Sequence, residues 1–299
     1  MSILFSKFPM RKRILYCDLT LERIPIVYLT LVSGEVKELE VQKLEVGYAM
    51  PRMPNSYSQC IFDVKIPDGV TTLGNVFSYC RSLVSVTLPK SVKVIDSYAF
   101  NHCESLASVT LPESVEVIGE HAFSSCSSLA CVKIPESVTA IGRNAFSGCG
   151  LVSVTLPESI TTIGASAFEW CVSLTSVTIP KEVTTIERSS FCDCWSLRSV
   201  TIPAGVTTIR DRAFDECWSL KSATIPVGVT SIGRDRAFFH KTDVLVRMFW
   251  SLENFKRCDK SSRERIFTIL LCLCRLEIPT VVQRTILGFL MDLTGVLEI

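Results

Sequence analysis

Seven cysteines recur every 22 or 23 residues through the middle of this sequence, and residues of this type at regular spacing can serve several kinds of chemistry. They are Cys80, Cys103, Cys126, Cys149, Cys171, Cys194 and Cys217. A thiolate can ligate zinc or act as a nucleophile, two thiols can form a disulfide, and a protonated thiol packs like a small apolar side chain. The elements that position the cysteines decide among these uses.

Each of these cysteines belongs to a repeated unit that also contains a proline and a phenylalanine. The prolines are Pro67, Pro89, Pro112, Pro135, Pro157, Pro180, Pro203 and Pro226. The phenylalanines are Phe77, Phe100, Phe123, Phe146, Phe168, Phe191, Phe214 and Phe238, and the first seven precede a cysteine by three residues. Eight copies at one period indicate a solenoid, in which neighbouring coils stack to bury apolar side chains that no single coil can bury.

The pattern within one unit predicts how a coil is built. Residues 85–89, Ser-Val-Thr-Leu-Pro, alternate polar and apolar side chains, which is typical of a short strand with one face toward the core. The proline ends the strand because it cannot donate to a sheet. Val92 and Ile95 then return to the core, and residues 97–100 form a tight helical or 3₁₀ turn. We therefore expect one parallel strand in each coil of about 23 residues.

Stacked coils place equivalent side chains above one another, so the cysteines form a column beside the phenylalanines. The inward position favours a ladder of buried thiols. Neighbouring coils about 4.8 Å apart are also near the Cα separation that a disulfide tolerates, so partial disulfide formation under oxidation stays open. A zinc site is disfavoured because zinc needs four converging ligands rather than a line.

Two of the units show a resemblance to a known family. The segments Ser108–Leu129 (SVTLPESVEVIGEHAFSSCSSL) and Ser199–Leu220 (SVTIPAGVTTIRDRAFDECWSL) resemble the BspA-type leucine-rich repeat. The shared pattern is a strand ending in Ile/Leu-Pro, then V-T-x-I-G, A-F and C-x-S-L. The resemblance implies an α/β leucine-rich-repeat solenoid that binds proteins or surfaces without catalysis. Bacterial members are often exported adhesins, whereas members without an export signal occur in protists and algae, and this sequence resembles the latter.

The composition narrows the partners and the location that we expect. The chain of 299 residues has a net charge of +1, which gives no basic field for nucleic acid. Near the N-terminus the basic cluster follows the short apolar stretch, the reverse of a secretory signal, and the apolar run Ile266–Cys274 is about half of the roughly 20 residues that span a membrane. We expect a cytoplasmic monomer whose 14 cysteines are free thiols, with no membrane span.

The two ends of the chain depart from the repeat, which predicts three regions. Residues 1–59 contain alternating segments that indicate degenerate strands forming an N-terminal cap, and residues 60–241 hold the eight repeats. Residues 242–299 have helical spacing of apolar residues, beginning with VLVRMFWSLENF, and predict a small helical C-terminal cap. Within this region Ile278–Leu290 resembles the start of an F-box, which implies recruitment of a ubiquitin-ligase subunit.

The outward side chains of the predicted strands are the candidate partner-binding residues. They form a serine column and a threonine column on one face: Ser85, Thr87, Ser108, Thr110, Ser153, Thr155, Ser176, Thr178, Ser199 and Thr201. Trp195 and Trp218 occupy the same place in successive repeats and could form a contact patch or shield the edge of the coils.

No constellation in the sequence supports catalysis, a metal or a cofactor. His102, His121 and His240 do not cluster by the repeat geometry, and the C-x-C pairs at Cys192 and Cys272 lack the usual C-x-x-C redox spacing. A glycine-rich phosphate loop and a nucleophile elbow are also missing from the sequence. We interpret the protein as a non-enzymatic protein–protein interaction module with unidentified protein partners. The alternatives are a cell-surface adhesin or structural protein, and an F-box-like adaptor.

Overall fold

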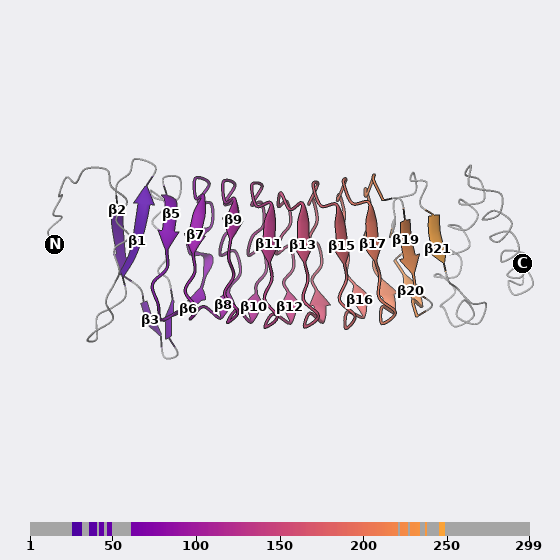
Figure 1. Cartoon of the computed structure of the whole chain (residues 1–299), viewed down its shortest axis with the longest axis horizontal. Coiled ribbons are helices and arrows are strands. Elements are labelled where there is room, and N and C mark those ends of the chain that lie inside the picture. Colours follow the sequence, from indigo (N-terminus) through magenta and orange to yellow (C-terminus); the bar gives the residue numbers. More distant parts are fainter. Residues whose placement is uncertain are drawn as a thin grey trace, which may run out of the picture.

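The computed structural model of the chain is an elongated solenoid whose coils stack side by side (Figure 1). It describes residues 61–220 throughout, residues 222–226, 228–233 and 237, and the backbone of the outlying strands β1 to β4 and β21. The described coils bury one continuous apolar core along the axis of the stack.

The first parallel sheet is built from the Ser-x-Thr segments that the sequence predicted to be strands. Its strands are β5 (Ile61–Lys65), β7 (Ser85–Thr87), β9 (Ser108–Val109), β11 (Cys131–Lys133), β13 (Ser153–Thr155), β15 (Ser176–Thr178), β17 (Ser199–Thr201) and β19 (Ser222–Ile225). In β7 the valine is buried while the flanking serine and threonine are exposed, which confirms the predicted alternation.

A second parallel sheet shows that one strand per coil was too few. Its strands are β6 (Val70–Leu73), β8 (Val94–Ile95), β10 (Val117–Ile118), β12 (Ala140–Ile141), β14 (Thr162–Ile163), β16 (Thr185–Ile186), β18 (Thr208–Ile209) and β20 (Ser231–Ile232). Most of these strands have two residues, too few for alternation to be recognised in the sequence. They become strands because the coils on either side supply hydrogen-bond partners.

The ends of the solenoid carry further strands. At the N-terminal end β1 (Ile26–Leu31) pairs antiparallel with β2 (Val36–Glu40) and β5, and β3 (Gln42–Leu44) pairs antiparallel with β4 (Gly47–Ala49), which lies beside β6. At the other end β21 (Leu245–Met248) pairs parallel with β19. The prediction of a helical C-terminal cap is therefore wrong at these residues, because the sheet edge of β19 supplies main-chain partners that an isolated sequence cannot show.

The other predictions about the C-terminal end fall outside the described residues. They concern the remaining helices of the cap and the F-box-like segment Ile278–Leu290.

The third side of each coil is a tight turn rather than a helix, which corrects the α/β assignment. Regular helix in the described part of the chain is limited to one 3₁₀ turn, η1 (Asn75–Phe77). In the turn around Phe100, the N–H groups of Tyr98, Phe100 and His102 donate to carbonyls of the next coil, while those of Ala99 and Asn101 donate three residues back. Three of these five N–H groups are therefore used between coils, and no run of bonds within the segment can form a helix.

The turn also holds two residues per coil in the left-handed region, two positions before and two positions after the phenylalanine. The first column is Tyr98, His121, Asn144, Ser166, Ser189 and Arg212; the second is Tyr79, His102, Ser125, Gly148, Trp170, Asp193 and Glu216. Residues with positive φ cannot continue a right-handed helix, and most of these are not glycine, so the stacking of coils has to hold them there.

Stacked phenylalanine rings fill the centre of the solenoid. Successive rings from Phe77 to Phe214 have centroids 5.2 to 5.5 Å apart and planes within 10° of parallel. Each of the seven phenylalanines in this column is fully buried. Large buried rings at this spacing supply both apolar burial and favourable ring contacts, so they are the main stabilising element of each coil.

The repeated cysteines lie against this aromatic column, as the sequence predicted. Each thiol from Cys103 to Cys217 donates a hydrogen bond to the carbonyl of the phenylalanine in the preceding coil, with Sγ–O distances of 3.0 to 3.2 Å. Burial raises the pKa of Cys80 and of Cys171 to about 12. The column is therefore suited to packing and unsuited to nucleophilic chemistry, which needs a thiolate. Its redox state in the cell stays a prediction.

The ladders of both sheets are interrupted near the middle of the solenoid, after β13 and β14. The coil that leads into β13 is one residue shorter than its neighbours, because Cys149 is followed directly by Gly150 and Leu151. A Cβ at Gly150 would lie 2.2 Å from the carbonyl oxygen of Ser127, so only glycine allows this close approach. The interruption divides the first sheet into an N-terminal and a C-terminal section.

Candidate partner-binding surfaces

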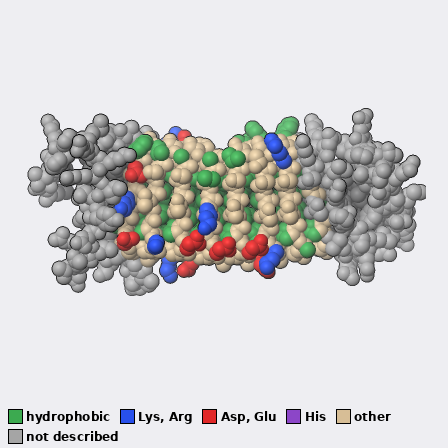
Figure 2. All heavy atoms as spheres, viewed as in Figure 1, with side chains coloured by type: hydrophobic (Ala, Val, Ile, Leu, Met, Phe, Trp, Pro, Cys, Tyr) green, Lys and Arg blue, Asp and Glu red, His purple; other side chains and the backbone are tan. Residues whose placement is uncertain are grey.

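The Ser/Thr face is the solvent-exposed surface of the first sheet, and the structure places all ten predicted residues on it in an exposed position. The parallel register stacks like residues directly: Ser85 beside Ser108, Ser176 beside Ser199, and Thr178 beside Thr201. Figure 2 shows that the middle of this surface is mostly neither charged nor hydrophobic, with a row of acidic side chains along one long edge. The face offers hydroxyl groups for hydrogen bonding at the spacing of the strands.

Three charged residues interrupt the Ser/Thr face, Asp63 and Lys65 in β5 and Lys133 in β11. Asp63 replaces a serine in β5, and its carboxylate accepts a hydrogen bond from the Ser85 hydroxyl. Lys133 replaces a threonine in β11, and its ammonium group lies 3.1 Å from the carboxylate of Glu113. The strands β7, β9, β13, β15 and β17 present no charged side chain, so most of the Ser/Thr face is uncharged.

The turn edge is the surface formed by the turn around each phenylalanine, and in the first coils it carries aromatic pairs. Tyr79 stacks on His102 with centroids 4.6 Å apart, and Tyr98 stacks on His121 at 4.8 Å. Burial is the main cause that lowers the pKa of His121, which also lies 3.1 Å from the side-chain amide of Asn144. These histidines therefore contribute to stacking between coils rather than to a metal site.

In the later coils the turn edge carries three partly exposed tryptophans. Trp170 and Trp195 meet edge to face with centroids 5.7 Å apart. The exposed fractions of Trp170, Trp195 and Trp218 are 48%, 45% and 58%. Side chains of this size are seldom left half exposed on three neighbouring coils, so the edge presents a large apolar surface to solvent.

Acidic residues lie immediately beneath these indoles. Asp193 is buried, and its carboxylate accepts hydrogen bonds from the Cys192 thiol at 3.1 Å and from the Trp195 indole N–H at 3.4 Å. Asp215 is fully buried and accepts from the Arg212 guanidinium and from the main-chain N–H of Glu216, both at 3.1 Å. Neighbouring Asp215 is the largest cause that raises the pKa of Arg212. The acids are thus held in fixed positions by hydrogen bonds.

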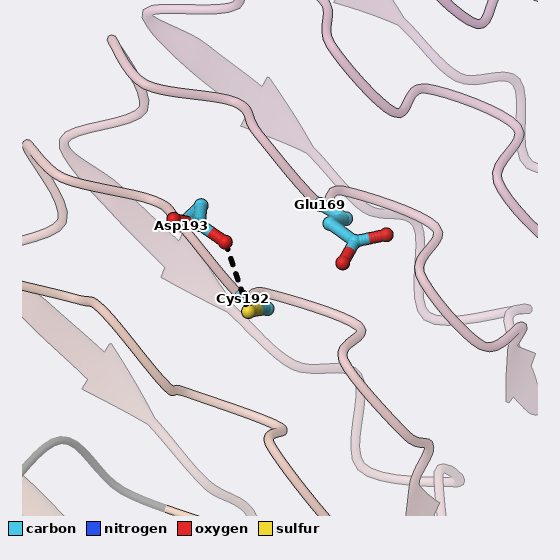
Figure 3. A group of neighbouring side chains, drawn as sticks. All are labelled: Glu169, Cys192 and Asp193. Atoms are coloured by element: carbon cyan, nitrogen blue, oxygen red, sulfur yellow. Dashed lines mark hydrogen bonds between the residues drawn. The ribbon is translucent and has the colours of Figure 1, made fainter.

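Glu169, Cys192 and Asp193 come close enough to be considered as metal ligands, with one ligand atom of each within 4.8 Å of the others. Figure 3 shows the Cys192–Asp193 hydrogen bond, with Glu169 approaching from the neighbouring coil. The group does not fit a zinc ion well. Burial raises the pKa of the Cys192 thiol, and the Arg212 guanidinium lies 3.6 Å from its sulfur, where its positive charge opposes a second cation.

A hollow of about 320 Å³ opens on the turn edge between successive coils, and it is lined by Asp193, Trp195, Glu216 and Trp218. The two tryptophans that the sequence singled out therefore share one concave surface. Arrangements of two indoles and two carboxylates can bind a cationic group, through the faces of the rings and through the charges.

The repeat pattern matches a known family model over most of the chain. The model describes the BspA type leucine-rich repeat region, and it matches residues 54–171 and 128–245. This chain belongs to the BspA-type leucine-rich repeat family. The parallel sheets, the phenylalanine column and the cysteine ladder are thus the structure of BspA-type repeats in this chain.

Solved structures of bacterial proteins share this BspA-type architecture. A leucine-rich repeat protein from Bacteroides ovatus is 28% identical over 76% of this chain and 58% of its own length, with a TM-score of 0.61. The T. pallidum leucine-rich repeat protein is 32% identical over 60% of this chain and 87% of its own, with a TM-score of 0.50. A leucine-rich cell surface protein from Faecalibacterium prausnitzii is 30% identical over 68% and 64%, with a TM-score of 0.47. The chain spans just over half of the Bacteroides protein.

Two further findings bear on function. A search of curated proteins found no match. In the portion of the BspA-type solenoid that the structure describes, helices long and apolar enough to cross a bilayer do not occur.

Sequence reasoning identified the tryptophans but missed the acids beside them. Within two successive BspA-type repeats the segments Asp193–Trp195 and Glu216–Trp218 both read acid-Cys-Trp. That recurrence was the available signal, because the cysteine fixes the register of its two neighbours. The burial of Asp215 and its bond with Arg212 had no such signal, since the two residues belong to a turn whose shape depends on the adjacent coils.

Proposed function

We propose that this BspA-type solenoid is a non-enzymatic module that binds a protein partner through its Ser/Thr face and its tryptophan edge. The family supports a role in protein interaction or as a surface scaffold. The observation that carries the proposal is the exposed hydroxyl surface of the first sheet, which charged residues interrupt only in β5 and β11. Such a surface can be desolvated by a partner at low electrostatic cost, since it holds few charges to remove from water.

The absence of a role in catalysis is part of the same proposal. Nucleophilic catalysis by a cysteine needs a thiolate, and burial raises the pKa values of Cys80, Cys171 and Cys192. We propose that the module acts in the cytoplasm as a monomer, where reducing conditions would keep its thiol column protonated and unbridged.

Substitution of the Ser/Thr face tests the interaction. Lysine already stands in the threonine column at positions 65 and 133, so we expect Thr178→Lys with Ser199→Lys to leave the fold intact. A matched control places Val117→Lys and Thr162→Lys on exposed positions of the second sheet. Proximity labelling in the native cell, followed by quantitative mass spectrometry, would compare the three chains.

We expect a set of partners that is lost with the face variant and kept with the control. Equal recovery of those partners by both variants would place the contact elsewhere and overturn the assignment to the Ser/Thr face. Thiol alkylation of the protein from fractionated cells would test its location: disulfides and a surface fraction would overturn the cytoplasmic proposal in favour of a surface scaffold.

A further inference from the structure

We propose that the Ser/Thr face over the coils of β9, β11 and β13 binds a short amphipathic helix of the protein partner, with one apolar stripe and one basic stripe. This inference rests on the proposed interaction function, because it names the chemistry that the partner would present to the same face. Two columns of side chains that flank the hydroxyl groups carry the inference, one apolar and one acidic.

The apolar column is formed by the residue that precedes the serine position of each strand. Its members in five consecutive coils are Phe62, Val84, Ala107, Ala130 and Val152. Main-chain bonds stack them: the N–H of Val84 donates to the carbonyl of Phe62, and that of Val152 to the carbonyl of Ala130, both at 2.9 Å. Phe62 and Val152 are 46% and 48% exposed, and both alanines are exposed as well. An apolar strip therefore faces solvent beside the hydroxyl groups.

The acidic column is formed by the residue that directly follows the proline of each coil. Glu113, Glu136 and Glu158 occupy this position in three consecutive coils, and all three are exposed. Lys90 and Lys181 hold the same position in the coils on either side, so the acidic column is confined to the coils of β9, β11 and β13. Like charges on adjacent coils repel one another, and cationic groups of a partner would relieve that repulsion.

The carboxylates of the acidic column are open to different degrees. Glu113 pairs with the ammonium group of Lys133 at 3.1 Å, so the inference does not depend on it. Glu158 accepts the main-chain N–H of Lys181 with one oxygen, at 3.5 Å. Glu136 has no hydrogen-bond or ion-pair partner among the residues that the structure describes. Glu136 and Glu158 therefore supply the charge that is complementary to a basic partner.

The spacing of the coils favours a helix over an extended strand as the bound segment. Adjacent coils lie about 4.8 Å apart, and one face of an α-helix repeats about every 5.4 Å along its axis. One face of an extended strand repeats about every 6.8 Å, so a strand along the solenoid would fall out of step by about 2 Å per coil. Figure 2 shows hydrophobic side chains along the long edge opposite to the acidic row. A helix lying between these edges would direct its apolar stripe to one and its long basic side chains to the other.

The same two columns have different chemistry in the later coils, which limits the site to the N-terminal section. The apolar column continues as Thr175 and Arg198, and the acidic column continues as Lys181 and Ala204. A basic amphipathic helix would meet charges of its own sign there. The later coils therefore provide an internal control on the same chain.

A basic amphipathic peptide tests the inference on the full chain. The probe repeats Leu-Lys-Lys-Leu-Leu-Lys-Lys twice and is about 21 Å long as a helix. Two matched peptides carry either glutamate in place of lysine or the same residues in an order without an apolar stripe. Cys131 is exposed in β11, in the middle of the face, so its rate of alkylation by iodoacetamide, measured by mass spectrometry, reports occupancy.

The three peptides separate charge from amphipathic pattern. We expect the basic peptide to slow alkylation of Cys131 about fivefold at saturation, with a Kd on the order of 10 μM. We expect both matched peptides to bind about tenfold more weakly. Equal protection by the glutamate peptide would overturn the basic partner, and equal protection by the reordered peptide would overturn the amphipathic helix.

Substitutions in the two columns locate the contact. Ala130→Arg and Glu136→Lys introduce residue types that the same columns already hold in the later coils, so the fold should be kept. The matched controls, Thr175→Arg and Ala204→Lys, make the same changes outside the site. We expect the first pair to weaken binding about tenfold and the controls to leave it unchanged, each judged against the alkylation rate of the same variant without peptide.

Two outcomes of these substitutions would overturn the assignment to the coils of β9, β11 and β13. They are equal losses in both pairs, and full binding by the first pair. The partner set lost in cells with the Ser/Thr face variant is a separate readout, so failure of the peptide experiment leaves the proposed function distinguishable.

Discussion

The first and last coils of this solenoid present different chemistry on the same edge. Around coils with Tyr79 and His102 the edge carries stacked rings and the exposed Arg81–Glu104 ion pair, and Tyr79 is itself half exposed. Around coils with Trp195 and Trp218 it is open, with half-exposed indoles above acids. The backbone of the turn is the same in both places, with positive φ at the position two residues after the phenylalanine.

A second difference lies in the turn that follows the proline of each coil. In the N-terminal section the hydroxyls of Ser91, Ser114 and Ser159 donate to main-chain carbonyls of the preceding coil at 2.6 to 2.8 Å. At the corresponding positions the later coils have Glu182 and Gly205. In the described coils a serine hydroxyl at this position therefore joins neighbouring coils in the N-terminal section, whereas the later coils use threonine hydroxyls at other positions, such as Thr207 and Thr230.

This contrast shows that the repeat keeps a constant core while the residues of the edge vary. The phenylalanine column and the thiol hydrogen bonds continue through both regions, so the core does not depend on which side chains occupy the edge. Each coil can then change its edge residues at little cost to the stack.

The largest expected effect tests whether the two regions share one core. Phe123→Ala and Phe191→Ala each remove a fully buried ring, one from each section. We expect both to lower the free energy of unfolding by about 3–5 kcal/mol, through lost apolar burial and the cavity left behind. Urea denaturation followed by circular dichroism measures this, with the exposed Phe62→Ala as control. A much smaller loss of unfolding free energy for one variant than for the other would show that the column does not stabilise the two sections equally.

The next largest effect compares a buried acid of the later coils with an exposed acid of the first coils. Arg212→Met leaves the fully buried Asp215 carboxylate without its guanidinium, and we expect it to cost about 2–3 kcal/mol of unfolding free energy. Arg81→Met breaks the exposed ion pair with Glu104 and should cost less than about 1 kcal/mol. The same urea experiment compares them; equal costs would contradict the difference in burial between the two edges.

Alkaline pH should destabilise the chain through its cysteine column. The pKa of Cys171 is raised from 9.0 to about 12, so above pH 9 the unfolded thiol ionises while the folded thiol stays protonated. The stability that this thiol contributes is complete below pH 9 and is lost as the pH rises toward 12. At pH 10 the loss of unfolding free energy is about 1.4 kcal/mol.

Urea denaturation under reducing conditions at pH 8 and pH 10 checks the effect of this thiol. Between pH 8 and pH 10 we expect Cys171→Ala to lose about 1.4 kcal/mol less unfolding free energy than the parent chain. Parallel pH dependence of the two chains would show that this thiol does not carry the effect.

A smaller gain is expected from an irregular position in the later coils. The residue before the phenylalanine is alanine in most coils, but Ser190 stands there, fully buried and with its hydroxyl unpaired. We expect Ser190→Ala to raise the free energy of unfolding by about 1 kcal/mol, because no buried donor is left unsatisfied. The reciprocal change, Ala145→Ser, should lower it. Thermal and urea denaturation of both variants measures these changes. A lower free energy of unfolding for Ser190→Ala would contradict the prediction and would indicate that the hydroxyl has a partner.

Much of the inner structure could be predicted from spacing. The columns of Phe100 and Cys103, and the outward Ser85 and Thr87, follow from one period of 22 or 23 residues and from alternation within a strand. The second sheet could not be predicted, since β8 has only two residues and alternation over two residues carries no information. The helical prediction at Leu245–Met248 failed for a related reason. A short apolar segment beside a sheet edge becomes a strand because that edge offers main-chain hydrogen-bond partners.

The candidate site divides in the same way. The sequence alone determined that Trp195 and Trp218 occupy equivalent places and that the Ser/Thr columns face outward, because both are consequences of the repeat. Only the tertiary structure decided that Asp193 and Glu216 join the two indoles around one hollow, and that Arg212 is engaged by Asp215. The physical reason is that a repeat fixes which residues are stacked, whereas the direction of each edge side chain depends on left-handed turns that form only when the next coil accepts their N–H groups.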